Sequence, residues 1–167
     1  MALKLQIMLF LLFPLLGMAQ DKSNLSRFHI ESDRDYMAQS PYTFEQTIER
    51  LQKVLESKNI TVFATIEHHK AAEAVGEELA PATVLIVGNP KVGTALMQEN
   101  PQLAIELPLK ILIYKEGKIV RIRYEKISAI AEKYHIKQTF STAEKIDAAM
   151  LQLIKSSIGE YPRGTAD

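Results

Sequence analysis

The chain has 167 residues, 47% of them hydrophobic, and its 20 basic residues balance its 20 acidic ones. This balance argues against nucleic acid as a partner, because nucleic-acid binding needs a basic patch, and against an anionic membrane surface. The sequence contains no cysteine, which excludes disulfides, zinc–thiolate sites, iron–sulfur clusters and thiol chemistry.

Residues 1–19 are predicted to be a cleavable signal peptide. A basic residue is followed by an apolar run, and the small residues Gly17 and Ala19 precede a cut before Gln20. The alternative is a retained anchor, but the run has about half the length that a spanning helix needs. We therefore expect an exported protein with no stable membrane insertion after cleavage. The segment resembles bacterial signal peptides, which favours the periplasm over secretion into the medium.

Residues 20–39 are predicted to be a polar lead-in, either extended or with a weak strand around 28–30. A helix then begins after Thr43, which forms a capping-box pattern with Gln46. Its apolar residues follow at helical spacing: Phe44, Ile48, Leu51 and Leu55. The helix is expected to end near Asn59 in a left-handed turn.

The next three elements alternate between strand and helix patterns. Residues 60–67 alternate with a period of two, which predicts a strand with one buried face. Residues 68–79 return to helical spacing. Residues 83–87 form a short apolar run that is typical of a strand covered on both faces.

Asn89 and Pro90 suit the N-cap and first position of a short helix over residues 91–100. Strands over residues 109–114 and 119–124 are joined by a glycine-containing turn, which predicts a hairpin. The hairpin makes the sheet mixed or antiparallel, so the fold class is α+β.

A weak helix is expected over residues 127–135, and the pair Ser141 and Glu144 predicts a second capping box at the start of the last helix. Nothing in the sequence divides the mature chain. We therefore expect a single domain at 40–159, followed by a polar tail at 160–167.

Over roughly residues 42–125 the chain resembles the family catalogued as domain of unknown function 302. The matching pieces are residues 43–55, 63–68, 75–76, 88–90 and 107–110, with Ala71, Leu79, Met97 and Pro101. The resemblance implies a TBP-like α+β fold, in which helices pack on one face of a curved, mostly antiparallel sheet. It also implies a homodimer, and it implies no established activity, substrate or cofactor. His69 and the region after Tyr124 are less typical of the family.

The turn formed by Gly88, Asn89, Pro90 and Lys91 is the first candidate ligand site. A capped helix start presents free backbone N–H groups that can hold an anion, and Lys110 could add positive charge. The alternative is that Asn89 caps the helix and nothing binds there, because the pattern lacks the features of a P-loop.

His68 is the second candidate, since it stands beside Glu67 at a junction between strand and helix. A histidine with a carboxylate can bind a metal or act as acid and base, but the simpler explanation is a capping or partly buried structural histidine. Pro108 opens a strand between Glu106 and Lys110. These two charges either meet a ligand near Gly88 or frame the strand entrance at the surface.

The sequence leaves three hypotheses about function. The favoured one is an exported dimeric module that binds a small ligand, an anion among the options, or a protein partner without catalysis, because no catalytic constellation is found in the sequence. The alternatives are a structural or interaction subunit without a ligand, and a His68-dependent metal-binding or enzymatic stress protein. No catalytic residue, metal ligand or cofactor is assigned.

Overall fold

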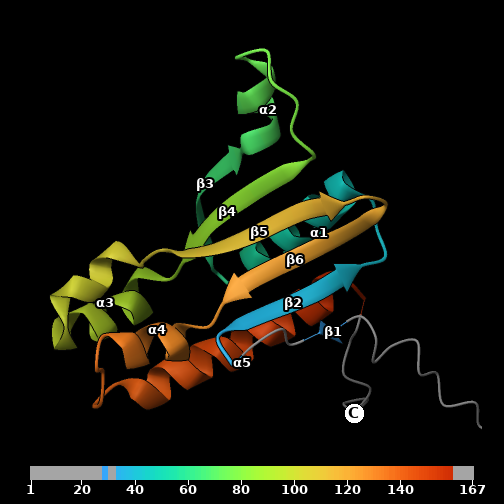
Figure 1. Cartoon of the computed structure of the whole chain (residues 1–167). Helices are drawn as coiled ribbons and strands as arrows, with labels where there is room; N and C mark the ends of the chain where they lie inside the picture. Colours follow the sequence, from blue (N-terminus) through green and yellow to red (C-terminus); the bar gives the residue numbers. More distant parts are fainter. Residues whose placement is uncertain (1–27, 30–32, 160–167) are drawn as a thin grey trace, which may run out of the picture.

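The computed structural model describes residues 28–29 and 33–159. The predicted signal peptide and C-terminal tail lie outside the described residues. The fold is a single α+β domain built on one antiparallel sheet, with strand order β1-β2-β6-β5-β4-β3 (Figure 1). The strands are β1 (Phe28–His29), β2 (Asp35–Ser40), β3 (Thr61–Glu67), β4 (Ala82–Gly88), β5 (Leu109–Glu116) and β6 (Ile119–Glu125). The predicted α+β class is therefore confirmed.

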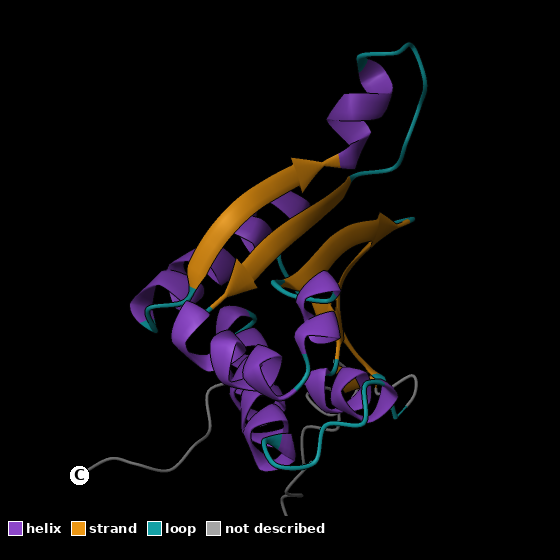
Figure 2. Cartoon of the chain, turned by 90° about the vertical axis from the view of Figure 1, so that its left-hand side faces the viewer, coloured by secondary structure: helices purple, strands orange, loops and turns teal. Residues whose placement is uncertain are grey.

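Helices cover one face of this curved sheet, and the core lies between the two layers (Figures 1 and 2). The helices are α1 (Phe44–Ser57), α2 (His68–Glu73), α3 (Pro90–Glu99), α4 (Ile127–Lys133) and α5 (Phe140–Ser157), with a 3₁₀ helix, η2 (Pro101–Ile105). Alternate residues of the central strands point into the core, among them Leu85, Ile111 and Ile122. Leu51 and Leu55 of α1 meet them from the helical layer.

Several local predictions are confirmed. Thr43 and Gln46 form the capping box at the start of α1, and Asn59 has a φ of 54°, in the left-handed region. Asn89 caps α3, with Pro90 at its first position. These features depend on neighbours in sequence, which is why the sequence alone predicts them.

β2 corrects the predicted lead-in. The sequence places residues 35–39 outside the core, but β2 pairs with β6 along all six of its residues, and Met37 and Ala38 are buried. The strand mixes Asp35, Tyr36 and buried apolar residues without alternation, so its pattern carries no strand signal. The weak strand expected around residues 28–30 is present as β1.

The helix predicted over residues 68–79 is shorter than expected. α2 ends at Glu73, buries no residue, and projects beyond the sheet with the following loop (Figure 2). Val75 and Leu79, the last two apolar residues at helical spacing in this segment, are 75% and 51% exposed. Helical spacing predicts a helix only where a surface covers the apolar stripe, and here no described element does so.

The capping box predicted for the last helix is wrong, because its N-cap is Thr139 rather than Ser141. The carboxylate of Glu99, at the end of α3, accepts the backbone N–H groups of Lys137, Gln138 and Thr139 at 2.6, 2.9 and 2.8 Å. It also accepts the Thr139 hydroxyl at 2.7 Å. A distant acid thus fixes the residues that lead into α5, and no local side chain caps the helix.

Glu99 makes the stability of the contact between α3 and the start of α5 depend on pH. The N–H donors, that of Lys137 first, lower the pKa of its carboxyl from 4.5 to about 2. A pKa lowered by folding stabilises the protein above the unfolded value, and this contribution is lost as pH falls from about 5 to about 2. We expect the urea midpoint of the unaltered chain to exceed that of Glu99→Gln at pH 6, and the gap to narrow towards pH 2. A constant gap across that range would contradict the assignment.

Candidate functional site

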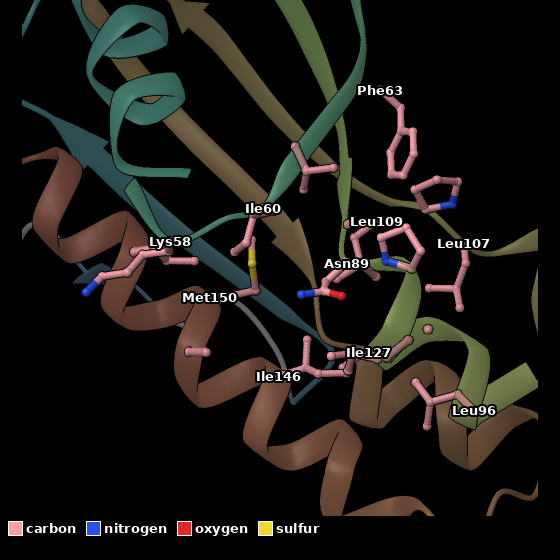
Figure 3. Close-up of a pocket in the computed structure, with 18 of the residues that line it drawn as sticks. Lys58, Ile60, Phe63, Asn89, Leu96, Leu107, Leu109, Ile127, Ile146 and Met150 are labelled. Atoms are coloured by element: carbon pink, nitrogen blue, oxygen red, sulfur yellow. The ribbon is translucent and has the colours of Figure 1, made fainter. Parts of the chain in front are cut away.

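A cavity of ≈ 800 Å³ opens between the helical layer and one end of the sheet (Figure 3). It lies where β3 begins and β4 ends, with α3 on one side and α5 on the other. Most of its lining is apolar, including Ile60, Phe63, Leu107, Ile146 and Met150. Among the described residues that line it, Lys58 carries the sole charge.

The turn after β4 brings α3 to the edge of the cavity. A Cβ added at Gly88 would lie 3.4 Å from Cε2 of Phe63 and 3.5 Å from Cβ of Pro108, at ordinary van der Waals distance, so both groups pack against the backbone of this turn. The Asn89 side chain accepts the Lys91 N–H at 3.1 Å and starts α3 directly after the strand. α3 therefore leaves the sheet beside the cavity and forms one of its walls.

The structure brings four of the seven predicted site residues together. Gly88, Asn89, Pro90 and Pro108 all line the cavity. Lys91 is exposed and lies outside the lining. Lys110 also lies outside it, and its ammonium donates to the Glu106 carbonyl oxygen at 3.1 Å.

His68 lies elsewhere, exposed at the start of α2 and at the opposite end of β3 from the cavity. Its neighbour His69 is held in place, since the ring packs edge-on against Phe44 and its Nδ1 lies 3.1 Å from the Ala82 carbonyl oxygen. No group of three or more histidine or carboxylate side chains that could hold a metal ion occurs in the part of the chain that the structure describes.

Glu106 acts between helices rather than at the cavity. Its carboxylate accepts the Lys133 ammonium at 2.7 Å and the Tyr134 hydroxyl at 2.8 Å, and these bonds lower the pKa of Glu106. It therefore ties the end of η2 to α4. For Glu106 and Lys110 the sequence left two alternatives, contact with a ligand near Gly88 or surface charges beside the start of a strand. The geometry matches the second.

Sequence reasoning missed the wall that α5 supplies. Ile146, Met150 and Leu153 were interpreted as a core stripe, but they also line the cavity with Ala149 and Ser156. The alternating pattern of residues 60–67 did not single out Phe63, and a bulge between Val62 and Ala64 shifts the register beside it. The breadth of the α5 stripe, which continues to Ala149, is the one local signal that pointed to a second role.

Among the described residues, the lining includes no histidine, aspartate or glutamate. A large apolar cavity with few polar groups is the usual form of a small-molecule site.

The family model described as "Domain of unknown function DUF302" matches residues 36–156. The match extends beyond the 42–125 of the sequence resemblance and takes in most of β2 and α5. A crystal structure of an uncharacterized conserved protein DUF302 from Bacillus stearothermophilus is similar, with a TM-score of 0.68 and 19% identity, covering 77% of this chain and 98% of that one. At this identity the likeness shows the fold.

Two curated relatives are Fluoride-specific ion channel FluC 1 of Brucella suis biovar 1 and of Brucella abortus biovar 1. Each is 33% identical over 79 residues, which are 47% of this chain and 31% or 29% of the relative. The chain thus spans less than a third of the length of these relatives. Among the described helices, none has the length and apolar character to cross a membrane.

Proposed function

The chain belongs to the DUF302 family, and from this premise we propose that it is an exported, homodimeric module that binds a small apolar molecule without catalysing a reaction. The cavity carries this proposal. Its ≈ 800 Å³ lies within the range of about 300–1,000 Å³ for ligand sites. The channel activity of the Brucella relatives is not part of the proposal, because the chain spans less than a third of them.

An anion held by the Gly88 turn is less well supported than an apolar ligand. The Asn89 side-chain oxygen Oδ1 already accepts the Lys91 N–H, the first of α3, and the Lys91 side chain lies outside the lining. The wall itself is formed by aliphatic and aromatic side chains, which favour ligands that leave water for an apolar surface.

One experiment tests export and ligand binding together. The chain is expressed with its own leader and isolated from the exported fraction, and native mass spectrometry is run before and after denaturation. We expect a mature chain that starts at Gln20 and carries extra mass that denaturation releases. Protein stripped of this mass should bind the neutral fluorophore N-phenyl-1-naphthylamine. A chain that has no adduct and does not bind the fluorophore would overturn the proposal.

Self-association is supported by a separate observation, the free edge of β3. β3 is the last strand of the sheet on that side, and Phe63 and Ile66 are 50% and 43% exposed. Edge strands are normally protected by charge or proline, but the interior of β3 carries neither. An antiparallel two-fold pairing of β3 with a second copy would place Ala64 near the axis and satisfy both edges. This arrangement also suits the alternative of a structural subunit.

Replacing Ala64 with lysine is expected to convert the dimer to a monomer, because two ammonium groups would face each other across the axis. Light scattering coupled to gel filtration measures the mass. Ala148→Lys, on an exposed position of α5, is the matched control and should leave the dimer intact. A dimer that persists in Ala64→Lys would rule out pairing through β3.

The His68-dependent metal or enzyme hypothesis receives no comparable support. His68 is exposed, and its neighbour Glu67 pairs with Lys70 at 2.8 Å. We therefore rank this hypothesis below ligand binding and self-association.

A further inference from the structure

Polar groups are unevenly distributed around the cavity. Thr94 and Asn89 each use an oxygen within α3, where the Thr94 hydroxyl donates to the Pro90 carbonyl and Asn89 caps the helix. Lys58, Gln152 and Ser156 also line the cavity, and no described residue bonds to their side chains. The polar groups open to a ligand are therefore mainly these three.

These three residues belong to one end of the cavity. Gln152 and Ser156 are four residues apart and share one face of α5. Lys58 directly follows α1, and its side chain reaches the same side of the cavity as α5. Figure 3 shows Lys58 beside α5, across the cavity from Leu96 and Leu107.

The opposite end is apolar. Leu96, Met97, Leu107 and Pro108 line it, and Leu96 is fully buried. Methionine side chains adapt to the shape of a flexible ligand, so Met97 suits a chain without fixed geometry. An elongated ligand would place its apolar part here and its polar part at Lys58.

We propose that the ligand is a single-chain carboxylate of the fatty-acid class, with its head at Lys58 and its hydrocarbon chain directed towards α3. This inference rests on the proposed function and names its ligand. The Lys58 ammonium has no acidic partner among the described residues, and no acidic side chain lines the cavity to repel an anion. Gln152 and Ser156 can donate to the second oxygen of the carboxylate.

The test uses the full mature protein after delipidation, with displacement of N-phenyl-1-naphthylamine as the readout. Dodecanoate should bind about tenfold more tightly than dodecan-1-ol, because a charge-assisted bond to Lys58 favours the anion. Lys58→Gln should remove this preference and leave the affinity for dodecan-1-ol unchanged. Lys53→Gln is the matched control, since Lys53 lies on α1, pairs with Glu49 and does not line the cavity.

The outcomes separate this inference from the proposed function. Equal binding of dodecanoate and dodecan-1-ol, with no effect of Lys58→Gln, would overturn the carboxylate and leave apolar ligand binding intact. Tighter binding of dodecyl phosphate than of dodecanoate would overturn it as well and assign a phosphate head. If neither the fluorophore nor any of these amphiphiles binds, both proposals fail.

Discussion

Asp147→Ala is expected to destabilise the fold by about 3–5 kcal/mol, because several buried hydrogen-bond donors would lose their acceptor at once. The Asp147 carboxylate is 5% exposed and accepts the Tyr124 hydroxyl at 2.6 Å and the N–H groups of Ile127 and Ser128 at 2.7 and 3.0 Å. It joins α5 to the end of β6 and to the first turn of α4. A loss of this size is a large share of the roughly 5–15 kcal/mol that stabilises a typical domain.

Urea unfolding followed by circular dichroism measures this loss. Tyr124→Phe removes one of the donors and should cost about 1–2 kcal/mol, less than Asp147→Ala. Glu144→Ala changes an exposed acid on the same helix and serves as the control, with an expected effect within about 0.5 kcal/mol. If Asp147→Ala were no more destabilising than this control, the network would not hold the helices in place.

The parts of the fold that could be predicted depend on residues close together in the chain. The caps of α1 and α3 each need one side chain two or three residues from its partner. The turn between β5 and β6 places Gly117 at a φ of 58°, which its glycine signal indicated. At these positions the conformation that the local sequence favours is also the one that the tertiary fold requires.

The parts that could not be predicted depend on distant residues. The residues that lead into α5 are held by Glu99 from α3, about forty positions earlier. α4 begins where Asp147 of the following helix accepts the Ile127 N–H. Neither acid differs in sequence from a solvated surface charge. Such partners become visible only after the helices are placed in space.

The residues of the candidate site also fall into those with a local sequence signal and those that only the packing brings to the site. Gly88, Asn89 and Pro90 were found because a strand followed by a capped helix start has a local signature. The wall from α5 and the position of Phe63 were not, since one requires the packing of the last helix and the other a bulge at Val62. The apolar character of the cavity therefore emerged only from the fold, since most of its lining comes from elements far apart in the sequence.

The strongest effect on binding is expected from Ala149→Trp. Ala149 lies on α5, is exposed, and lines the cavity. An indole in this position would occupy space that a ligand needs, and steric overpacking of this kind costs about 1–3 kcal/mol, or roughly tenfold or more in affinity. The protein itself should lose little stability, because tryptophan costs about 0.5 kcal/mol relative to alanine at a helix position.

Ala148→Trp is the matched control for this change. It places the same side chain one position earlier on the same helix, at an exposed residue that does not line the cavity. Titration with N-phenyl-1-naphthylamine should show weak binding in Ala149→Trp and unaltered binding in Ala148→Trp, with similar melting temperatures. Equal binding by both variants would mean that the fluorophore does not occupy the part of the cavity that Ala149 lines, and the cavity would lose its role as the ligand site.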